Sequence, residues 1–105
     1  MKQYTSTEQT AKLIELGFEK PKSIIDVWAH ETDIDMEYEY EFAYSIGELI
    51  EMLPTIVNNF TLWIGRDERS NQWFVKYHPR TLVVDEELID ALYDMLVRLK
   101  EEGVS

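Results

Sequence analysis

The chain has 105 residues, which is the size of one domain with a single core. It contains no cysteine, and this excludes disulfides, thiolate nucleophiles and cysteine-ligated zinc sites. Its 21 acidic and 10 basic residues give a net charge of −11, which repels phosphate backbones and anionic lipids, so we expect no direct binding to nucleic acids or membranes.

Hydropathy along the chain indicates one soluble domain over residues 1–105. No hydrophobic stretch follows the first lysine, as it would in a signal peptide. The longest run without Asp, Glu, Lys or Arg covers residues 52–65 and is interrupted by Pro54, so it is too short and too broken to span a bilayer. We therefore expect a cytoplasmic protein.

The first predicted element is a helix that begins near residues 5–7. Thr5 with Glu8, or Ser6 with Gln9, can form a reciprocal capping box at its start. The helix should end at Gly17, because glycine readily adopts the left-handed conformation that follows a last helical turn.

Two strands are predicted next, and they differ in pattern. Residues 24–30 are rich in β-branched and aromatic side chains, which favours a strand. Residues 33–42 alternate acidic with apolar side chains at every step, and Glu31 extends the acidic series by one place, so a strand there would send acids to water and apolar side chains into the core. A turn around residues 31–35 should join the two strands. The predicted acidic row is Glu31, Asp33, Asp35, Glu37, Glu39 and Glu41, and the predicted buried row is Ile34, Met36, Tyr38, Tyr40 and Phe42.

The second half of the chain predicts a helix, two strands and a final helix. Ser45 and Glu48 form the capping box of the second helix, which ends near Pro54. Residues 60–65 and 73–77 alternate as strands, joined by the polar turn 66–71. The last helix should begin at Asp85 as N-cap and end at Gly103. Its predicted buried stripe is Leu88, Leu92, Met95 and Leu99, widened by Ile89 and Leu96.

This order of elements predicts an α+β domain. The sequence of helix, two strands, helix, two strands and helix suits a mostly antiparallel four-stranded sheet that packs against the helices.

Several of these segments resemble a family of small uncharacterised proteins of gut bacteria and of their prophages and mobile elements. The resemblance lies in residues 5–9 (TSTEQ), 13–17 (LIELG), 45–54 (SIGELIEMLP) and 87–92 (ELIDAL), with Trp73 in the hairpin between the last two. It implies a shared fold and an accessory role, and it implies no activity. The acidic segment 31–41 departs from the family pattern.

The sequence offers no catalytic constellation and no cofactor motif. His30 and His78 are the only histidines and lack the spacing of a zinc site or a hydrolase triad. Asp33, Asp35 and Glu37 match the start of a calcium-binding EF-hand loop. However, tyrosines occupy positions six and twelve, where that loop needs glycine and glutamate, so such a loop is excluded. Weak divalent-cation binding on the strand face remains an alternative, but we expect no enzyme and no resident metal.

The acidic row has three readings: a solvated strand face, a surface for a basic protein, or a mimic of nucleic acid. Carboxylates two residues apart are spaced by about 6.6 Å, whereas duplex DNA carries one charge per about 1.7 Å, so a mimic would need further acidic rows beside this one.

A second candidate surface is aromatic. If Trp63 and Phe74 point away from the helices, they form an exposed patch suited to a partner or to a second copy of the chain. We therefore predict a non-catalytic protein-binding module with a basic protein partner or a homodimeric state, and, as the alternative, an acidic mimic that blocks a DNA-binding protein. The candidate partner-binding residues are Glu31, Asp33, Asp35, Glu37, Glu39, Glu41, Trp63 and Phe74.

Overall fold

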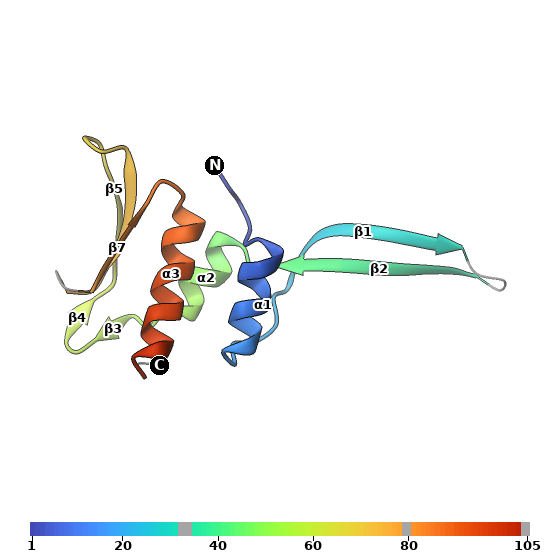
Figure 1. Ribbon diagram of the computed structural model, residues 1–105, viewed down its shortest axis with the longest axis horizontal. Coiled ribbons are helices and arrows are strands. Elements are labelled where there is room, and N and C mark those ends of the chain that lie inside the picture. Colours follow the sequence, from blue (N-terminus) through green and yellow to red (C-terminus); the bar gives the residue numbers. More distant parts are fainter. Residues whose placement is uncertain (32–34, 79–80, 104–105) are drawn as a thin grey trace.

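The chain forms three helices and seven strands in a computed structural model that describes residues 1–31, 35–78 and 81–103 (Figure 1). The predicted α+β class is confirmed. The elements are α1 (Thr7–Glu15), β1 (Ser23–Glu31), β2 (Met36–Ala43), α2 (Ile46–Met52), β3 (Ile56–Val57), β4 (Phe60–Thr61), β5 (Trp63–Asp67), β6 (Gln72–Lys76), β7 (Leu82–Asp85) and α3 (Leu88–Glu101).

The strands form three separate antiparallel sheets, so the predicted single four-stranded sheet is wrong. β1 pairs with β2, β3 pairs with β4, and β5, β6 and β7 form a three-stranded sheet in that order. The β1–β2 hairpin and the three-stranded sheet lie on opposite sides of the helices, which prevents a shared strand edge (Figure 1).

Local sequence signals set the ends of α1. The Ser6 side chain accepts a hydrogen bond from the Gln9 amide, and the Gln9 side chain accepts one from the Ser6 amide, which confirms that capping box. Gly17 has a φ of +97°, and the Phe18 amide donates to the Leu13 carbonyl at 3.1 Å. This is a Schellman ending, as expected after a left-handed glycine.

The start of α3 differs from the prediction. Glu87, not Asp85, is its N-cap, and no side chain caps this end. Asp85 is the last residue of β7, and its carboxylate accepts a hydrogen bond from the Glu87 amide at 3.1 Å. Its side chain therefore stabilises the turn between strand and helix. Gly103, with a φ of +76°, follows the end of α3 as predicted.

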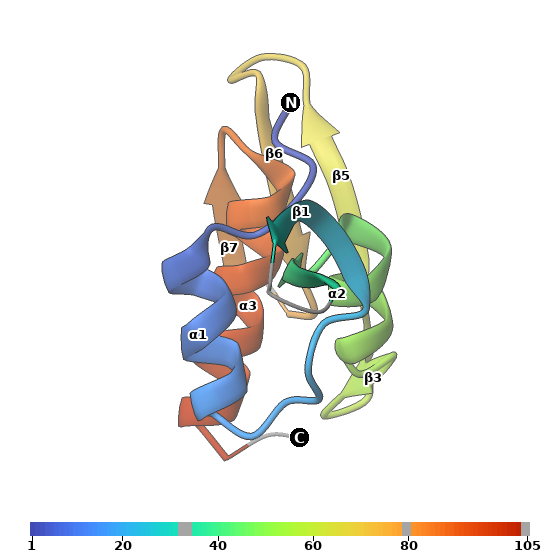
Figure 2. The ribbon, with the colours of Figure 1, turned by 90° about the vertical axis from the view of Figure 1, so that its right-hand side faces the viewer.

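The core lies between the helices and the inner face of the three-stranded sheet. Figure 2, which looks from the side of the hairpin, shows the strands of that sheet behind the helices. The predicted stripe of α3 is confirmed, because its residues are buried together with Leu13 of α1, Leu49 of α2 and Val75 of β6. Burial of this apolar surface is the main stabilising contribution to the fold.

Candidate functional site

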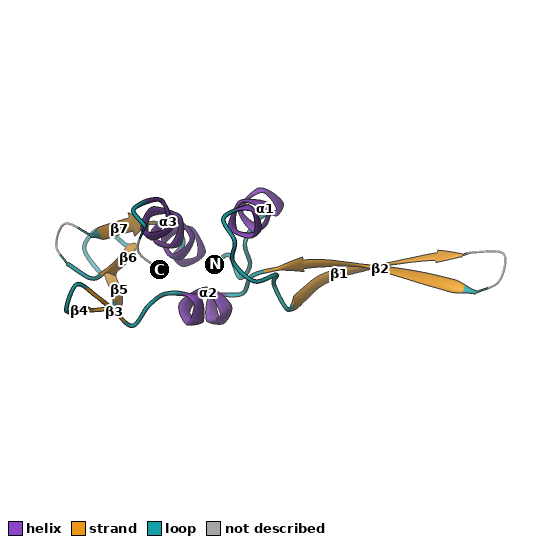
Figure 3. Ribbon diagram, turned by 90° about the horizontal axis from the view of Figure 1, so that it is seen from below, coloured by secondary structure: helices purple, strands orange, loops and turns teal. Residues whose placement is uncertain are grey.

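The β1–β2 hairpin projects from the body of the molecule as an arm, here defined as residues 23–31 and 35–43 (Figures 1 and 3). It accounts for the elongated shape, whose principal extents are 59, 32 and 18 Å. Cross-strand pairing runs from Ser23 with Ala43 at the base to Glu31 with Met36 at the far end. The predicted extended backbone over residues 36–42, and its antiparallel pairing with the preceding strand, are therefore confirmed.

One side of the arm is apolar and exposed to solvent. Met36, Tyr38, Tyr40 and Phe42 expose 43%, 56%, 52% and 42% of their surface, so the prediction that this row is buried is wrong. Alternation shows that two faces differ in polarity, but it does not specify what covers either face. We call this side the apolar face of the arm; it consists of Ile24, Val27, Ala29, Met36, Tyr38, Tyr40 and Phe42.

The other side of the arm carries carboxylates from both strands. Glu37, Glu39 and Glu41 alternate along β2 opposite Asp26, Trp28 and His30 of β1, which are not among the predicted partner-binding residues. The resulting acidic face consists of Asp26, Trp28, His30, Glu37, Glu39 and Glu41. Trp28 is 45% exposed at its centre. The His30 Nε2 atom lies 3.4 Å from a Glu39 carboxylate oxygen.

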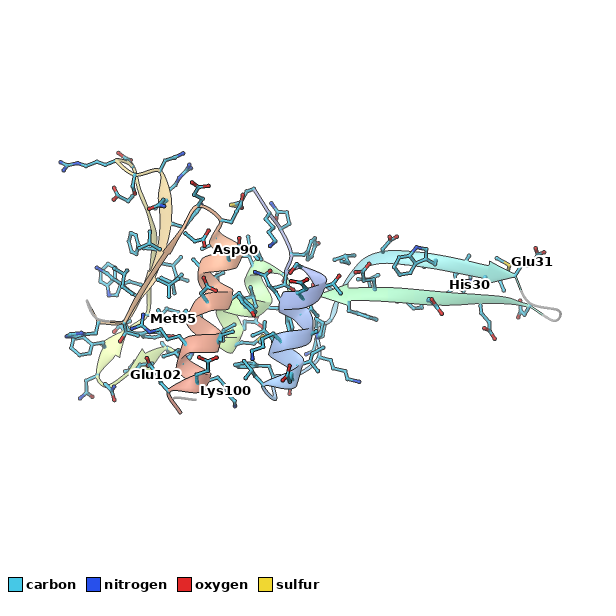
Figure 4. All side chains as sticks on the ribbon, viewed as in Figure 1. His30, Glu31, Asp90, Met95, Lys100 and Glu102 are labelled. Atoms are coloured by element: carbon cyan, nitrogen blue, oxygen red, sulfur yellow. The ribbon has the colours of Figure 1, made fainter. Side chains whose placement is uncertain are left out.

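The predicted row of six acids is not continuous. Glu31 belongs to β1 and pairs with Met36, so it lies on the apolar side at the far end of the arm, where Figure 4 labels it beside His30. Asp35 precedes β2, and its carboxylate accepts a hydrogen bond from the Met36 amide at 2.8 Å. Asp33 and Ile34 lie outside the described residues. The structure therefore brings together Glu37, Glu39 and Glu41 and separates Glu31 from them.

The carboxylate of Glu48 in α2 fixes the base of β1. It accepts hydrogen bonds from the Lys22 amide at 2.9 Å, from the Ser45 amide at 3.2 Å and from the Ser23 hydroxyl. Partial burial by itself would raise the pKa of Glu48, but these hydrogen bonds outweigh it and hold the pKa below its ordinary value. The capping residue of α2 is thus also the anchor of the arm.

The base of β2 is fixed by the buried residue Tyr44. Its amide donates to the Thr5 hydroxyl and its carbonyl accepts from the Thr5 amide, both at 3.0 Å. Its phenol donates to the Glu19 carbonyl, and burial raises its pKa. Beyond these anchors, the Thr7 hydroxyl donates to the Glu41 carboxylate at 3.3 Å. The arm is therefore anchored on both strands, and its outer part lies in solvent.

The second predicted surface is the outer face of the three-stranded sheet. Trp63 is 61% exposed and pairs with Lys76, while Phe74 in the next row is half-buried over Gly65. The neighbouring Val75 is fully buried against the core, so Phe74 points away from the helices, which is the condition set above for a patch with Trp63. A shallow depression of about 320 Å³ beside this patch is lined by Asp67, Ser70, Gln72, Phe74, Lys76, Leu82 and Val84.

The described part of the chain holds no group of three or more His, Asp or Glu side chains placed to bind a metal ion. None of its helices is long and apolar enough to cross a membrane. His78 contacts the Phe60 ring edge-on, with centroids 4.5 Å apart. Comparison with family models, with curated proteins and with solved structures found no match.

Proposed function

We propose that this chain is a non-catalytic protein-binding module that recognises a basic protein through the acidic face of its arm. The observation that carries the proposal is the arm itself, a hairpin anchored at its base and exposed on both faces. An isolated two-stranded hairpin is only marginally stable in water. Anchored hairpins with large exposed side chains are well suited to be covered by a partner.

Charge complementarity supports a basic partner. No Lys or Arg occurs between Lys22 and Arg66, and that interval contains nine acids. The negative electrostatic potential of such a segment raises the rate of association with a positive surface more than it raises the affinity of the final complex. Trp28 supplies an apolar anchor among the carboxylates, and tryptophan is enriched among the residues that dominate binding energy.

The arm geometry favours this reading over a mimic of nucleic acid. Along β2 the acidic row has three members, joined by Asp26 across the hairpin. Glu48 could have extended the acidic row, but its carboxylate already accepts hydrogen bonds from Lys22, Ser23 and Ser45. The density of charge thus remains far below that of a duplex. In keeping with the resemblance of the sequence, the module would serve a bacterium or a mobile element as a cytoplasmic accessory protein.

Affinity capture from a bacterial lysate with three baits tests the proposal. The first bait is the wild-type chain, and the second carries Glu37→Gln, Glu39→Gln and Glu41→Gln. The third is a charge-matched control with Glu15→Gln, Glu68→Gln and Glu101→Gln, all exposed and outside the arm.

We expect basic proteins that bind the wild type and the control, are lost from the arm variant, and are released by salt. Equal capture by all three baits, or equal loss from both variants, would contradict recognition by the arm. Release of DNA from a captured DNA-binding protein would instead support the mimic.

A further inference from the structure

The apolar face of the arm raises a separate question, because a partner held by carboxylates would leave it uncovered. No charged side chain interrupts this face from the Ile24–Phe42 pair to the Ala29–Tyr38 pair. Glu31 is the first charge along it, opposite Met36 at the far end. A surface of this kind requires an apolar occupant with a positive group at one end.

A hollow at the base of the arm continues the apolar face. It has a volume of about 410 Å³ and is lined by Thr10, Ile14, Lys20, Pro21 and Phe42. Phe42 belongs to both surfaces, so the hollow and the apolar face are contiguous. One end of the combined surface therefore carries Lys20, and the other end carries Glu31.

We propose that two copies of this chain pair through the apolar faces of their arms, related by a two-fold axis with the arms antiparallel. In this arrangement the Met36 end of each arm lies in the basal hollow of the other copy. Glu31 of each copy then meets the partner's Lys20, whereas a parallel arrangement would place two Glu31 side chains together. A two-fold interface is self-complementary, and this charge pattern satisfies that requirement.

The area is sufficient for a specific dimer. Six large apolar side chains of this face are each about half exposed, namely Ile24, Val27, Met36, Tyr38, Tyr40 and Phe42. With about 180 Å² for each fully exposed side chain, they provide about 500 Å² per copy. The two copies together would bury about 1,000 Å² before the basal hollows are added, which is the lower bound for a biological interface. The hollows and the Glu31–Lys20 pairs extend it.

The dimer is compatible with the net charge of −11, because the acidic faces point away from the shared interface. Packing of two sheets face to face separates them by about 10 Å, which leaves both acidic rows in water. Added salt screens the two Glu31–Lys20 attractions and also the repulsion between two copies of charge −11; because the repulsion involves many more charges, dimerisation should not weaken with salt. This distinguishes it from capture of a basic partner, which salt should weaken.

Sedimentation equilibrium of the full chain provides the first test. We expect a dimer with a dissociation constant of about 10 to 100 µM, typical of a small interface, and no weakening between 0.05 and 0.5 M NaCl. The double variant Tyr38→Ser/Tyr40→Ser should raise the dissociation constant at least about tenfold. Glu37→Gln/Glu39→Gln, on the opposite face, should not raise it. A monomer at about 500 µM, or a dimer indifferent to the tyrosine change, would overturn the proposal.

Charge exchange tests the antiparallel arrangement. Glu31→Lys and Lys20→Glu should each weaken the dimer about three- to tenfold, and the double variant should restore it. Because the chain has no native cysteine, single-cysteine variants report proximity directly. A short bis-maleimide should link Tyr38→Cys chains to Tyr40→Cys chains and should not link Glu39→Cys chains. Failure of the double exchange to restore pairing, or linking through position 39, would contradict this geometry. Far-UV circular dichroism of each variant separates loss of pairing from loss of folding.

Discussion

Replacement of Glu48 by glutamine should loosen the base of β1 and destabilise the fold. One carboxylate oxygen accepts from the Ser23 hydroxyl and the Ser45 amide, and the other accepts from the Lys22 amide. A glutamine amide has a single acceptor oxygen, so its NH₂ group would face either the Lys22 amide or the Ser45 amide donor to donor. Hydrogen bonds to a charged acceptor contribute about 1.5 to 3 kcal/mol, and partial exposure of Glu48 reduces this to about 1 to 2 kcal/mol.

Urea unfolding at pH 7, followed by tryptophan fluorescence, measures this loss against the charge-matched control Glu51→Gln, which should change stability by less than about 0.5 kcal/mol. The pKa of Glu48 is lowered in the folded state from an ordinary value of 4.5, so its contribution is present above pH 4.5 and disappears as the pH falls through the folded value. The stability difference between wild type and Glu48→Gln should therefore shrink below pH 4.5. Equal stability of the Glu48 and Glu51 variants at pH 7 would refute the anchoring role.

Three further predictions concern the body of the molecule. Leu92→Ala removes a side chain with 0% exposure and should lower the free energy of unfolding by about 2 to 5 kcal/mol in urea titrations, whereas Trp63→Ala should change it by less than about 1 kcal/mol. Gly65→Ala places a Cβ 2.5 Å from the Phe74 ring and should cost about 1 to 3 kcal/mol; if Phe74→Ala does not relieve most of that cost in a double-mutant cycle, the contact is not its cause. Burial raises the pKa of Tyr77 to about 12, so absorbance titration at 295 nm should show a phenol that ionises near pH 12 and is missing from Tyr77→Phe.

Signals confined to a few neighbouring residues were predictable from the sequence. The Ser45–Glu48 capping box and the helix end at Gly17 depend on residues within about one turn of each other. The residue types that form them can therefore be identified directly in the sequence. The buried stripe of α3 follows equally from its helical period. Each of these features is encoded locally, and each is observed.

Features that depend on which elements meet were not predictable in the same way. The alternation of residues 36–42 is that of a half-buried strand, yet among the described residues no helix or further strand covers the apolar side chains of the arm, which stay exposed. The sequence does not predict strand β7, because its short apolar run directly precedes a helix and has no alternation. The β3–β4 hairpin did have a signal, since Asn58 and Asn59 both adopt the positive φ of a tight two-residue turn.

The register of the arm explains why Glu31 does not join the predicted acidic row and why Trp28 lies beside that row. Glu31 is the last residue of β1 and pairs with Met36, so its side chain lies on the apolar side. The same register places Trp28 opposite Glu39, a neighbour that no spacing along the chain indicates. A cross-strand contact becomes visible only when the position of the turn is known.

Small-angle X-ray scattering, extrapolated to infinite dilution, tests most directly whether the arm stands free of the core. A compact domain of this length has a radius of gyration of about 13 Å. The projecting arm gives a Cα radius of gyration of 16.5 Å, with a longest extent of 59 Å. We predict a scattering radius close to this larger value, and a radius near 13 Å would mean that the arm folds back on the core and that its two faces are not free for a partner.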